Sequence, residues 1–123
     1  MTATYQDFDV SDSLAEKTYN AIEDSQKVSK GTNEVTKAIE RSEADLVVIA
    51  GDVSPEEIVM HLPALAEEKD IPYTFVPEKE ELGLAAGINV GTAAVAVTST
   101  GGAEDQVEDV VQKSNELREA EEE

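Results

Sequence analysis

The stretch LVVIAGDVSPEEIVMHLPALAEEKDIPYTFV, residues 46–76, decides the fold of this chain. It begins with a continuous β-branched run, residues 46–50, and ends with a second apolar run, residues 73–76. Short runs that are apolar on both faces are typical of central strands covered by helices on both sides. We therefore expect two central strands here.

The residues between these strands carry helix signals. Ser54 is a candidate N-cap, Pro55 suits the first helical position, and acidic residues follow directly. Pro63 then opens a further helical turn or a new helix that runs to Lys69. The stretch as a whole predicts strand, helix, strand.

Working outward, helical and extended patterns continue to alternate. The expected elements are a helix over 14–26 opened by a capping box of Ser13 and Glu16, a helix after Gly31 capped by Thr32, a helix over 82–86, a strand over 93–97 and a last helix through 107–117. Alternating strands and helices predict an α/β fold, a three-layer α/β/α sandwich. One domain spans residues 1–123, with flexible ends at 1–10 and 118–123, and the strand order cannot be read from this pattern.

Composition narrows the class of protein. The chain has 123 residues, and 28 Asp plus Glu against 9 Lys plus Arg give a formal net charge of −19. Because 40% of the residues are hydrophobic, this favours a folded domain with an acidic surface over a disordered chain. Such a surface suits molar salt, which predicts a halophilic source. Without cysteine, a long apolar run or a signal peptide, we expect a cytoplasmic protein with no disulfide and no membrane partner.

The positive charges are gathered in one segment. Residues 27–41 hold Lys27, Lys30, Lys37 and Arg41 against two glutamates, while the rest of the chain carries −21. Phosphate contacts are made by Lys and Arg, so this segment is a candidate nucleic-acid interface in an otherwise acidic protein. Chance clustering on a solvated helix face explains the same pattern.

Three polar residues share the start of the helix in this segment. Asn33 and Lys37 lie four residues apart on one face, with Glu34 beside them. An amide and an ammonium can donate to guanine O6 and N7, and a carboxylate can accept from base N–H groups. The trio can read base edges, although a capped surface helix with a Glu/Lys pair has the same spacing.

The loop over residues 88–90 is a second candidate contact. Ile88 and Val90 are apolar residues in a loop, which fits stacking on unpaired bases as well as anchoring to the core. The preceding glycines, Gly83 and Gly87, do not complete a phosphate-loop or dinucleotide motif, so close helix packing explains them better.

Nothing in the sequence favours catalysis or a bound cofactor or metal. Asp52 follows a strand, as a phospho-accepting aspartate would, but the paired acids at the end of an earlier strand are missing. His61 is the only histidine, so neither a triad nor a metal cluster can be built around it. Ser99 has no adjacent base. We predict a protein that is not an enzyme.

The block GTNEVTKAIER, residues 31–41, and the spaced motifs HLP, IPY, ELG and AG within residues 61–87 resemble the archaeal large-subunit ribosomal protein family called L-seven-Ae. The resemblance covers about residues 5–117. It implies a three-layer α/β/α sandwich with a central mixed sheet that binds RNA kink-turns, which are bent internal loops closed by tandem sheared G·A pairs.

The resemblance also assigns RNA contacts. Asn33, Glu34 and Lys37 would contact the sheared guanines, Lys30, Gly31, Thr32 and Arg41 would support the backbone, Ile88, Asn89 and Val90 would cover loop nucleotides, and Lys79 would meet phosphate. Ser54 departs from the family, where an acid is common, and receives no contact.

The implied function is a structural, RNA-binding component of the large ribosomal subunit. The implied partners are large-subunit ribosomal RNA, box C/D and H/ACA guide RNAs with their ribonucleoprotein proteins, and ribonuclease P RNA, with no DNA expected. Two rivals stay open: a small signalling or ligand-binding module centred on Asp52, and an acidic protein-interaction module that uses the last helix.

Overall fold

Four strands form one mixed sheet in the order β1-β4-β2-β3 in the computed structural model, which describes residues 6 and 8–122. The strands are β1 (Lys27–Lys30), β2 (Leu46–Ala50), β3 (Tyr73–Val76) and β4 (Ala94–Ser99). β2 and β3 are parallel, whereas β4 is antiparallel to both β1 and β2. The register pairs Lys30 with Val95, Ile49 with Ala94 and Ala50 with Val76. The ends of β1, β2 and β3 and the start of β4 therefore lie at one end of the sheet.

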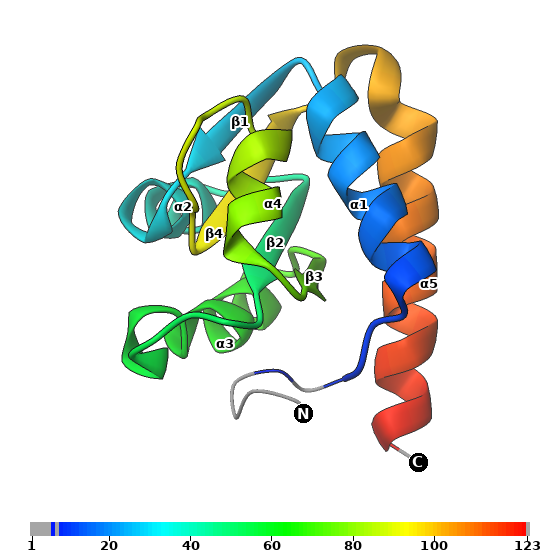
Figure 1. Cartoon of the computed structure of the whole chain (residues 1–123). Coiled ribbons are helices and arrows are strands. Elements are labelled where there is room, and N and C mark those ends of the chain that lie inside the picture. Colours follow the sequence, from blue (N-terminus) through cyan, green and yellow to red (C-terminus); the bar gives the residue numbers. More distant parts are fainter. Residues whose placement is uncertain (1–5, 7, 123) are drawn as a thin grey trace.

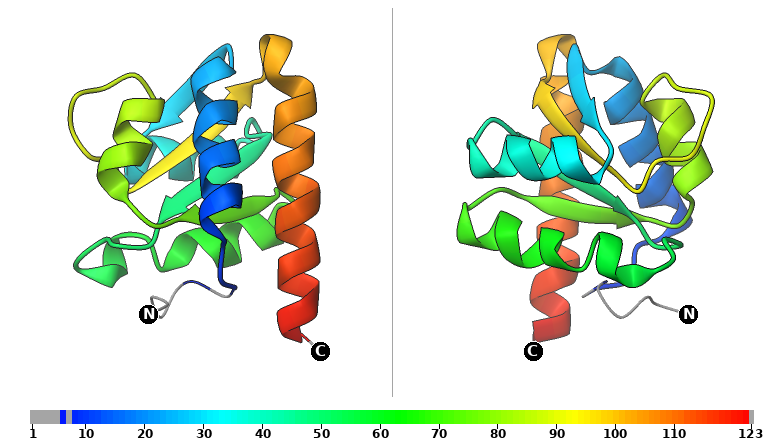
Figure 2. Two further views of the ribbon diagram at one scale, coloured as in Figure 1. Left: turned by 45° about the vertical axis from the view of Figure 1, so that its right-hand side comes forward. Right: turned by 90° about the vertical axis from the view of Figure 1, so that its left-hand side faces the viewer.

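Helices cover both faces of this sheet. They are α1 (Asp12–Asp24), α2 (Thr32–Glu40), α3 (His61–Glu68), α4 (Lys79–Ala85) and α5 (Glu104–Glu122), with short 3₁₀ turns at Glu56–Ile58 and Gly101–Ala103. Figures 1 and 2 show α1, α4 and α5 on one face and α2 with α3 on the other. The expected α/β class and the three-layer α/β/α sandwich are confirmed.

The two apolar runs differ in their position in the sheet. β2 is buried along its whole length between β4 and β3, as expected of a central strand. β3 is equally buried but lies at an edge, so its prediction as a central strand is wrong. The edge is covered by an aromatic cluster in which Phe8 lies 5.2 Å from Phe75 and Tyr73 lies 5.8 Å from Phe75, between ring centroids. Apolar runs report which faces are covered, not which strands are hydrogen-bonded neighbours.

Three local sequence predictions are corrected. Residues 27–30, to which the sequence pattern assigned no helix or strand, form the edge strand β1. Helix α1 begins two residues earlier than expected, because Ser11, not Ser13, is the N-cap and accepts the Leu14 N–H at 3.1 Å. The Ser54-Pro55 signal opens only the 3₁₀ turn Glu56–Ile58, since Pro55 has an extended backbone and no side chain caps that turn.

The last helix, expected through 107–117, forms as α5. Val107, Val110 and Ser114 are buried, and the Ser114 hydroxyl donates to Thr74 Oγ1 on β3 at 2.8 Å. α5 continues to Glu122. The predicted flexibility of residues 1–10 and 118–123 falls partly on 1–5, 7 and 123, which lie outside the described residues, and it stays a prediction.

Candidate nucleic-acid interface

The turn from β1 into α2 is made by Gly31. Its φ of 89° lies in the left-handed region that favours glycine. The Gly31 N–H donates to Ala94 O at 2.9 Å, which fixes the turn against the start of β4. Val35 N–H donates to Gly31 O at 2.9 Å as the first helical bond of α2. The helix therefore starts at a defined point at the end of the sheet.

The start of α2 carries the predicted polar trio on its solvent side. Asn33, Glu34 and Lys37 are all exposed, while Val35 and Ala38 face the core. Lys37 Nζ lies 3.5 Å from Glu34 Oε1, with side chains 55% and 62% exposed. An exposed pair of this kind is worth about 0–1 kcal/mol, so a ligand can replace it at little cost.

Thr32 does not cap α2, so that prediction is wrong. The N-cap is Gly31, which has no side chain to accept the first N–H groups, and Thr32 Oγ1 is a buried polar atom without a partner. The N–H groups of the first turn form no hydrogen bond to a capping side chain. A helix start of this kind presents free donors and partial positive charge to an anion.

A hydrogen-bond chain fixes α2 to α3. The Thr36 hydroxyl donates to Thr32 O at 2.7 Å and lies 3.0 Å from His61 Nε2. Because the single hydroxyl hydrogen of Thr36 is used on Thr32 O, His61 Nε2 must be the donor in the second bond. The only histidine is therefore a link between two helices.

Asp52 fixes α4 and, through it, the following loop. Its Oδ1 accepts the Lys79 N–H at 2.9 Å, at the first residue of α4, where Glu78 provides no side-chain cap. The Thr92 N–H donates to Lys79 O at 3.0 Å. The Asp52 carboxylate is thus used as a helix cap, which positions Lys79 and, through the Thr92 bond, the end of the loop that leads into β4.

The α4–β4 loop is held by a glycine contact. Ile88 N–H donates to Gly83 O at 3.0 Å, and a Cβ added to Gly83 would lie 1.9 Å from Val90 O. The packing explanation is confirmed for Gly83 but is wrong for Gly87, where an added Cβ would meet nothing within 4 Å and the φ of 85° is what favours glycine. Val90 is 69% exposed, Asn89 is exposed and Ile88 is half-buried, so the loop presents one fully exposed apolar side chain.

The structure brings some predicted residues together and separates one. Lys30, Gly31 and the trio lie at the end of the sheet where β4 begins, and Asp52 caps the helix that carries Lys79 at the same end. Arg41 is the C-cap of α2, eight residues from Asn33, which is about 12 Å along the helix axis.

Sequence reasoning missed two residues. Ile58 and Met60, in the β2–α3 connection, are 41% and 51% exposed. They lie in the segment after Ser54 and Pro55 that the sequence predicted to be helical, and no motif there marked them as exposed.

Residues 6 and 8–122 contain neither a candidate metal site nor a candidate membrane-spanning helix. No group of three or more His, Asp or Glu side chains there could hold a metal ion. No helix in the same part of the chain is long and apolar enough to cross a membrane.

Fold and site together define a small α/β/α domain with an exposed, uncapped helix start and a neighbouring apolar loop at one end of its sheet. The chain belongs to the ribosomal protein L7Ae/L30e/S12e/Gadd45 family, whose model matches residues 13–107. A similar solved structure is the Giardia lamblia 15.5kD RNA binding protein, with 32% sequence identity and a TM-score of 0.84. That match covers 88% of this chain and 92% of the other.

Proposed function

We propose that this chain is an RNA-binding protein that recognises and stabilises kink-turns as a structural component of the large ribosomal subunit. The observation that carries the proposal is the exposed trio Asn33, Glu34 and Lys37 on the uncapped start of α2. Membership of a ribosomal protein family and similarity to an RNA binding protein support it.

The trio supplies the groups that base-edge recognition needs. The Asn33 amide and the Lys37 ammonium donate to guanine O6 and N7, and the Glu34 carboxylate accepts from a base N–H. Guanines in sheared pairs expose these edges, whereas the deep major groove of a regular RNA duplex hides them. Glu34 and Lys37 lie 3.5 Å apart in an exposed ion pair that RNA would replace at little cost, so both groups are available to base edges.

The backbone around the trio suits phosphate. Free N–H groups in the first turn of α2, together with Gly31 and Thr32, form the anion-binding end of the helix. Lys30 precedes the turn and Arg41 extends the positive surface along α2. Thr32 Oγ1, buried without a partner, is an unsatisfied group of the kind that marks functional sites.

The loop over 88–90 completes the interface. Val90 and Ile88 offer apolar cover for unstacked nucleotides, Asn89 adds an amide, and Lys79 at the start of α4 contributes a charge for phosphate. The contact roles of all these residues are part of the proposal.

The RNA partners and the cellular setting are proposed from the family resemblance of residues 31–41 and 61–87. We infer that the protein acts in a cytoplasm of high salt on ribosomal RNA, on box C/D and H/ACA guide RNAs with their ribonucleoprotein proteins, and on ribonuclease P RNA during tRNA processing. The acidic composition supports the high-salt setting, because salt screens the repulsion of −19 charges.

The test compares one kink-turn RNA with a control RNA in which the G·A pairs are replaced by Watson–Crick pairs. Filter binding at fixed salt should show preference for the kink-turn, and Asn33→Ala or Lys37→Ala should weaken binding by about 1–3 kcal/mol, the range for a base-edge contact. Asn20→Ala, an exposed amide on α1, is the matched control. Equal binding of both RNAs by the intact protein would contradict the proposal and favour the alternatives, a signalling or ligand-binding module centred on Asp52 or an acidic protein-interaction module.

A further inference from the structure

A groove of about 600 Å³ runs between α2 and the edge strand β1, beside the base-reading trio. Lys27 enters it from β1, and Lys37 and Arg41 enter it from α2 and its C-cap. Glu34 and Glu43 also line it, so the groove carries a small positive excess in a chain of net charge −19.

The fold fixes Lys27 at this position. β1 pairs with β4 alone, and the register shifts between Lys27 and Val28, so that Thr98 is an extra residue on β4. A shift of this kind re-aims side chains at a sheet edge. The Thr98 hydroxyl donates to Lys27 O at 3.3 Å, and the Ser99 hydroxyl donates to Gln26 Oε1 at 2.8 Å. The backbone of Lys27 is therefore held from β4.

The charges of this groove are available to a ligand. Within residues 6 and 8–122, the Lys and Arg side chains in ion pairs are Lys17, Lys37 and Lys113. Lys27 and Arg41 therefore form no ion pair in this part of the chain. What distinguishes the groove is that it gathers three of the nine Lys and Arg side chains of a chain with 28 acidic residues, and this local positive excess suits a polyanion. Lys37 belongs to both the groove and the trio, so the groove continues the surface that would hold the bases.

We propose that this groove binds the sugar–phosphate backbone of the RNA stem that leaves the kink-turn, with Lys27 as a phosphate contact outside the motif of residues 31–41. The proposal rests on the proposed function and adds a partner segment to it. We favour an RNA backbone over an acidic protein as the occupant, because Lys37 lines the groove and also belongs to the trio. An RNA whose bases contact the trio would therefore have its backbone beside the groove.

The experiment measures the affinity of wild type, Lys27→Gln and Lys27→Arg for a kink-turn RNA across a tenfold range of KCl. One phosphate contact contributes about 0.7–0.9 to the slope of log K against log salt, so the ratio of wild-type to Lys27→Gln affinity should fall by about five- to eightfold over that range. Lys27→Arg should restore the wild-type slope. Lys69→Gln, an exposed lysine outside the groove, is the matched control and should leave the slope unchanged.

Two shortened RNAs, each with one stem cut back to the G·A pairs, identify the occupant. The Lys27→Gln effect should vanish on one of them and persist on the other. The groove proposal is overturned if Lys27→Gln behaves like Lys69→Gln, or if its effect survives both truncations. Failure of the proposed function would give a different result: the wild-type protein would bind the kink-turn and the G·A-replaced RNA equally well.

Discussion

Gly83 shows how one residue without a side chain positions the candidate interface. It lies inside α4, where alanine would normally be favoured by about 1 kcal/mol. A Cβ at this position would lie 1.9 Å from Val90 O and 3.2 Å from the Gly91 Cα. Because these are backbone atoms, no side-chain rotation relieves the overlap, and the loop that carries Val90 must move.

We expect Gly83→Ala to lower the free energy of unfolding by about 1–3 kcal/mol, as overpacking does, and to weaken RNA binding by displacing the 88–90 loop. Denaturant unfolding and RNA titration of the same variant measure the two effects. Gly102→Ala is the control, because a Cβ there meets nothing within 4 Å. A Gly83→Ala protein with wild-type stability and RNA affinity would show that the loop does not depend on this contact.

At the scale of elements, α4 is fixed at its start by two neighbours. Asp52 accepts the Lys79 N–H, and the Tyr19 hydroxyl reaches Glu78 O at 3.5 Å. Burial raises the pKa of Tyr19, so its hydroxyl stays protonated and can donate at neutral pH. α4 in turn carries Lys79 and leads into the 88–90 loop.

The Asp52 cap predicts a specific pattern of substitution. Asp52→Ala should cost about 0.5–2 kcal/mol of stability through loss of the cap, and Asp52→Asn should retain most of it, since an amide oxygen also accepts the Lys79 N–H. Thermal unfolding of the two variants measures this. A signalling module that depends on an ionised Asp52 predicts instead that Asn and Ala are equally damaging to function, because both remove the charge. Kink-turn affinity should follow the stability of the cap.

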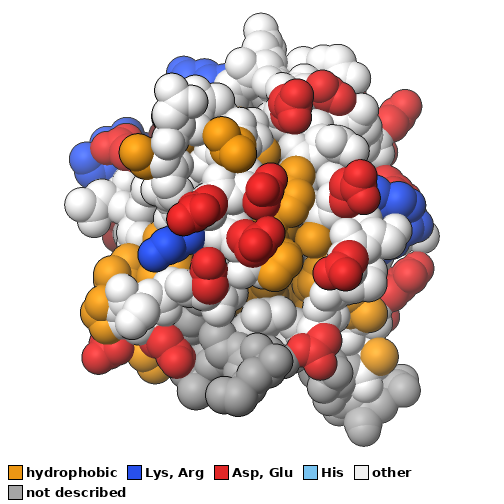
Figure 3. Space-filling model, in the orientation of Figure 1, with side chains coloured by type: hydrophobic (Ala, Val, Ile, Leu, Met, Phe, Trp, Pro, Cys, Tyr) orange, Lys and Arg blue, Asp and Glu red, His pale blue; other side chains and the backbone are white. Residues whose placement is uncertain are grey.

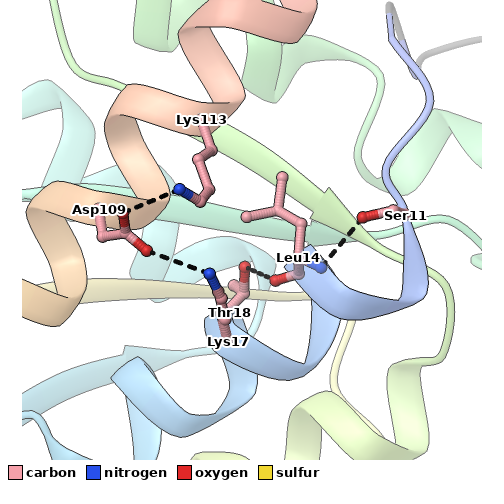
Figure 4. A network of polar contacts seen from close by, with 6 residues as sticks. All are labelled: Ser11, Leu14, Lys17, Thr18, Asp109 and Lys113. Carbon is pink, nitrogen blue, oxygen red and sulfur yellow. Dashed lines mark hydrogen bonds and ion pairs between the residues drawn. The ribbon is translucent and has the colours of Figure 1, made fainter.

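The α1–α5 pair is joined by a charged contact. Asp109 lies 3.1 Å from Lys113 Nζ on its own helix and 3.7 Å from Lys17 Nζ on α1 (Figure 4). In the same region Ser11 caps α1, and the Thr18 hydroxyl donates to Leu14 O at 2.8 Å. The hydrogen bond from Lys113 lowers the pKa of Asp109, and the charge of Lys17 acts in the same direction.

A lowered carboxyl pKa means that the contact stabilises the fold above the unfolded pKa of about 3.9 and is lost as pH falls below that value. At low salt, Asp109→Asn should therefore unfold at lower denaturant than wild type at pH 7, and the gap should close near pH 2. Asp105→Asn removes an acid from the same helix without breaking a described ion pair, and so corrects for general repulsion. A gap that is independent of pH would contradict the assignment.

At the scale of the whole molecule, the net charge of −19 is the main influence on how stability depends on salt. Outside residues 27–41 the chain carries −21, and Figure 3 shows acidic side chains spread among apolar ones over the face that bears α1, α4 and α5. At low ionic strength these charges repel across the surface, while molar salt shortens their range to about 3 Å. Since stability is usually only about 5–15 kcal/mol, repulsion of a few kcal/mol matters.

We expect the melting temperature to rise markedly from about 0.1 M to multimolar KCl. A variant with exposed α5 carboxylates changed to amides separates screening from general salting-out, because it should need less salt; the positions are Glu104, Asp105, Glu108, Glu116 and Glu119. Equal melting of wild type at both salt concentrations would refute the electrostatic account.

The sequence by itself determined the three layers, because a strand that is covered on both faces needs a continuous run of apolar residues, and such a run is visible in the sequence. The strand at 46–50, the helix after Gly31 and the last helix through 107–117 each follow from patterns of consecutive residues, and each is confirmed. The exposed side of α2 also followed from helical spacing, which placed Asn33, Glu34 and Lys37 together.

Only the tertiary structure decided which elements became neighbours. β3 looked central but forms an edge, β1 became a strand through pairing with β4, and the Ser54-Pro55 signal produced only a short turn. Asp52 caps a helix that begins 27 residues later, and Lys27 lines a groove built by α2. Strand pairing, long-range caps and grooves join residues that are distant in the chain, so their free energy depends on the assembled sheet and no local pattern encodes it.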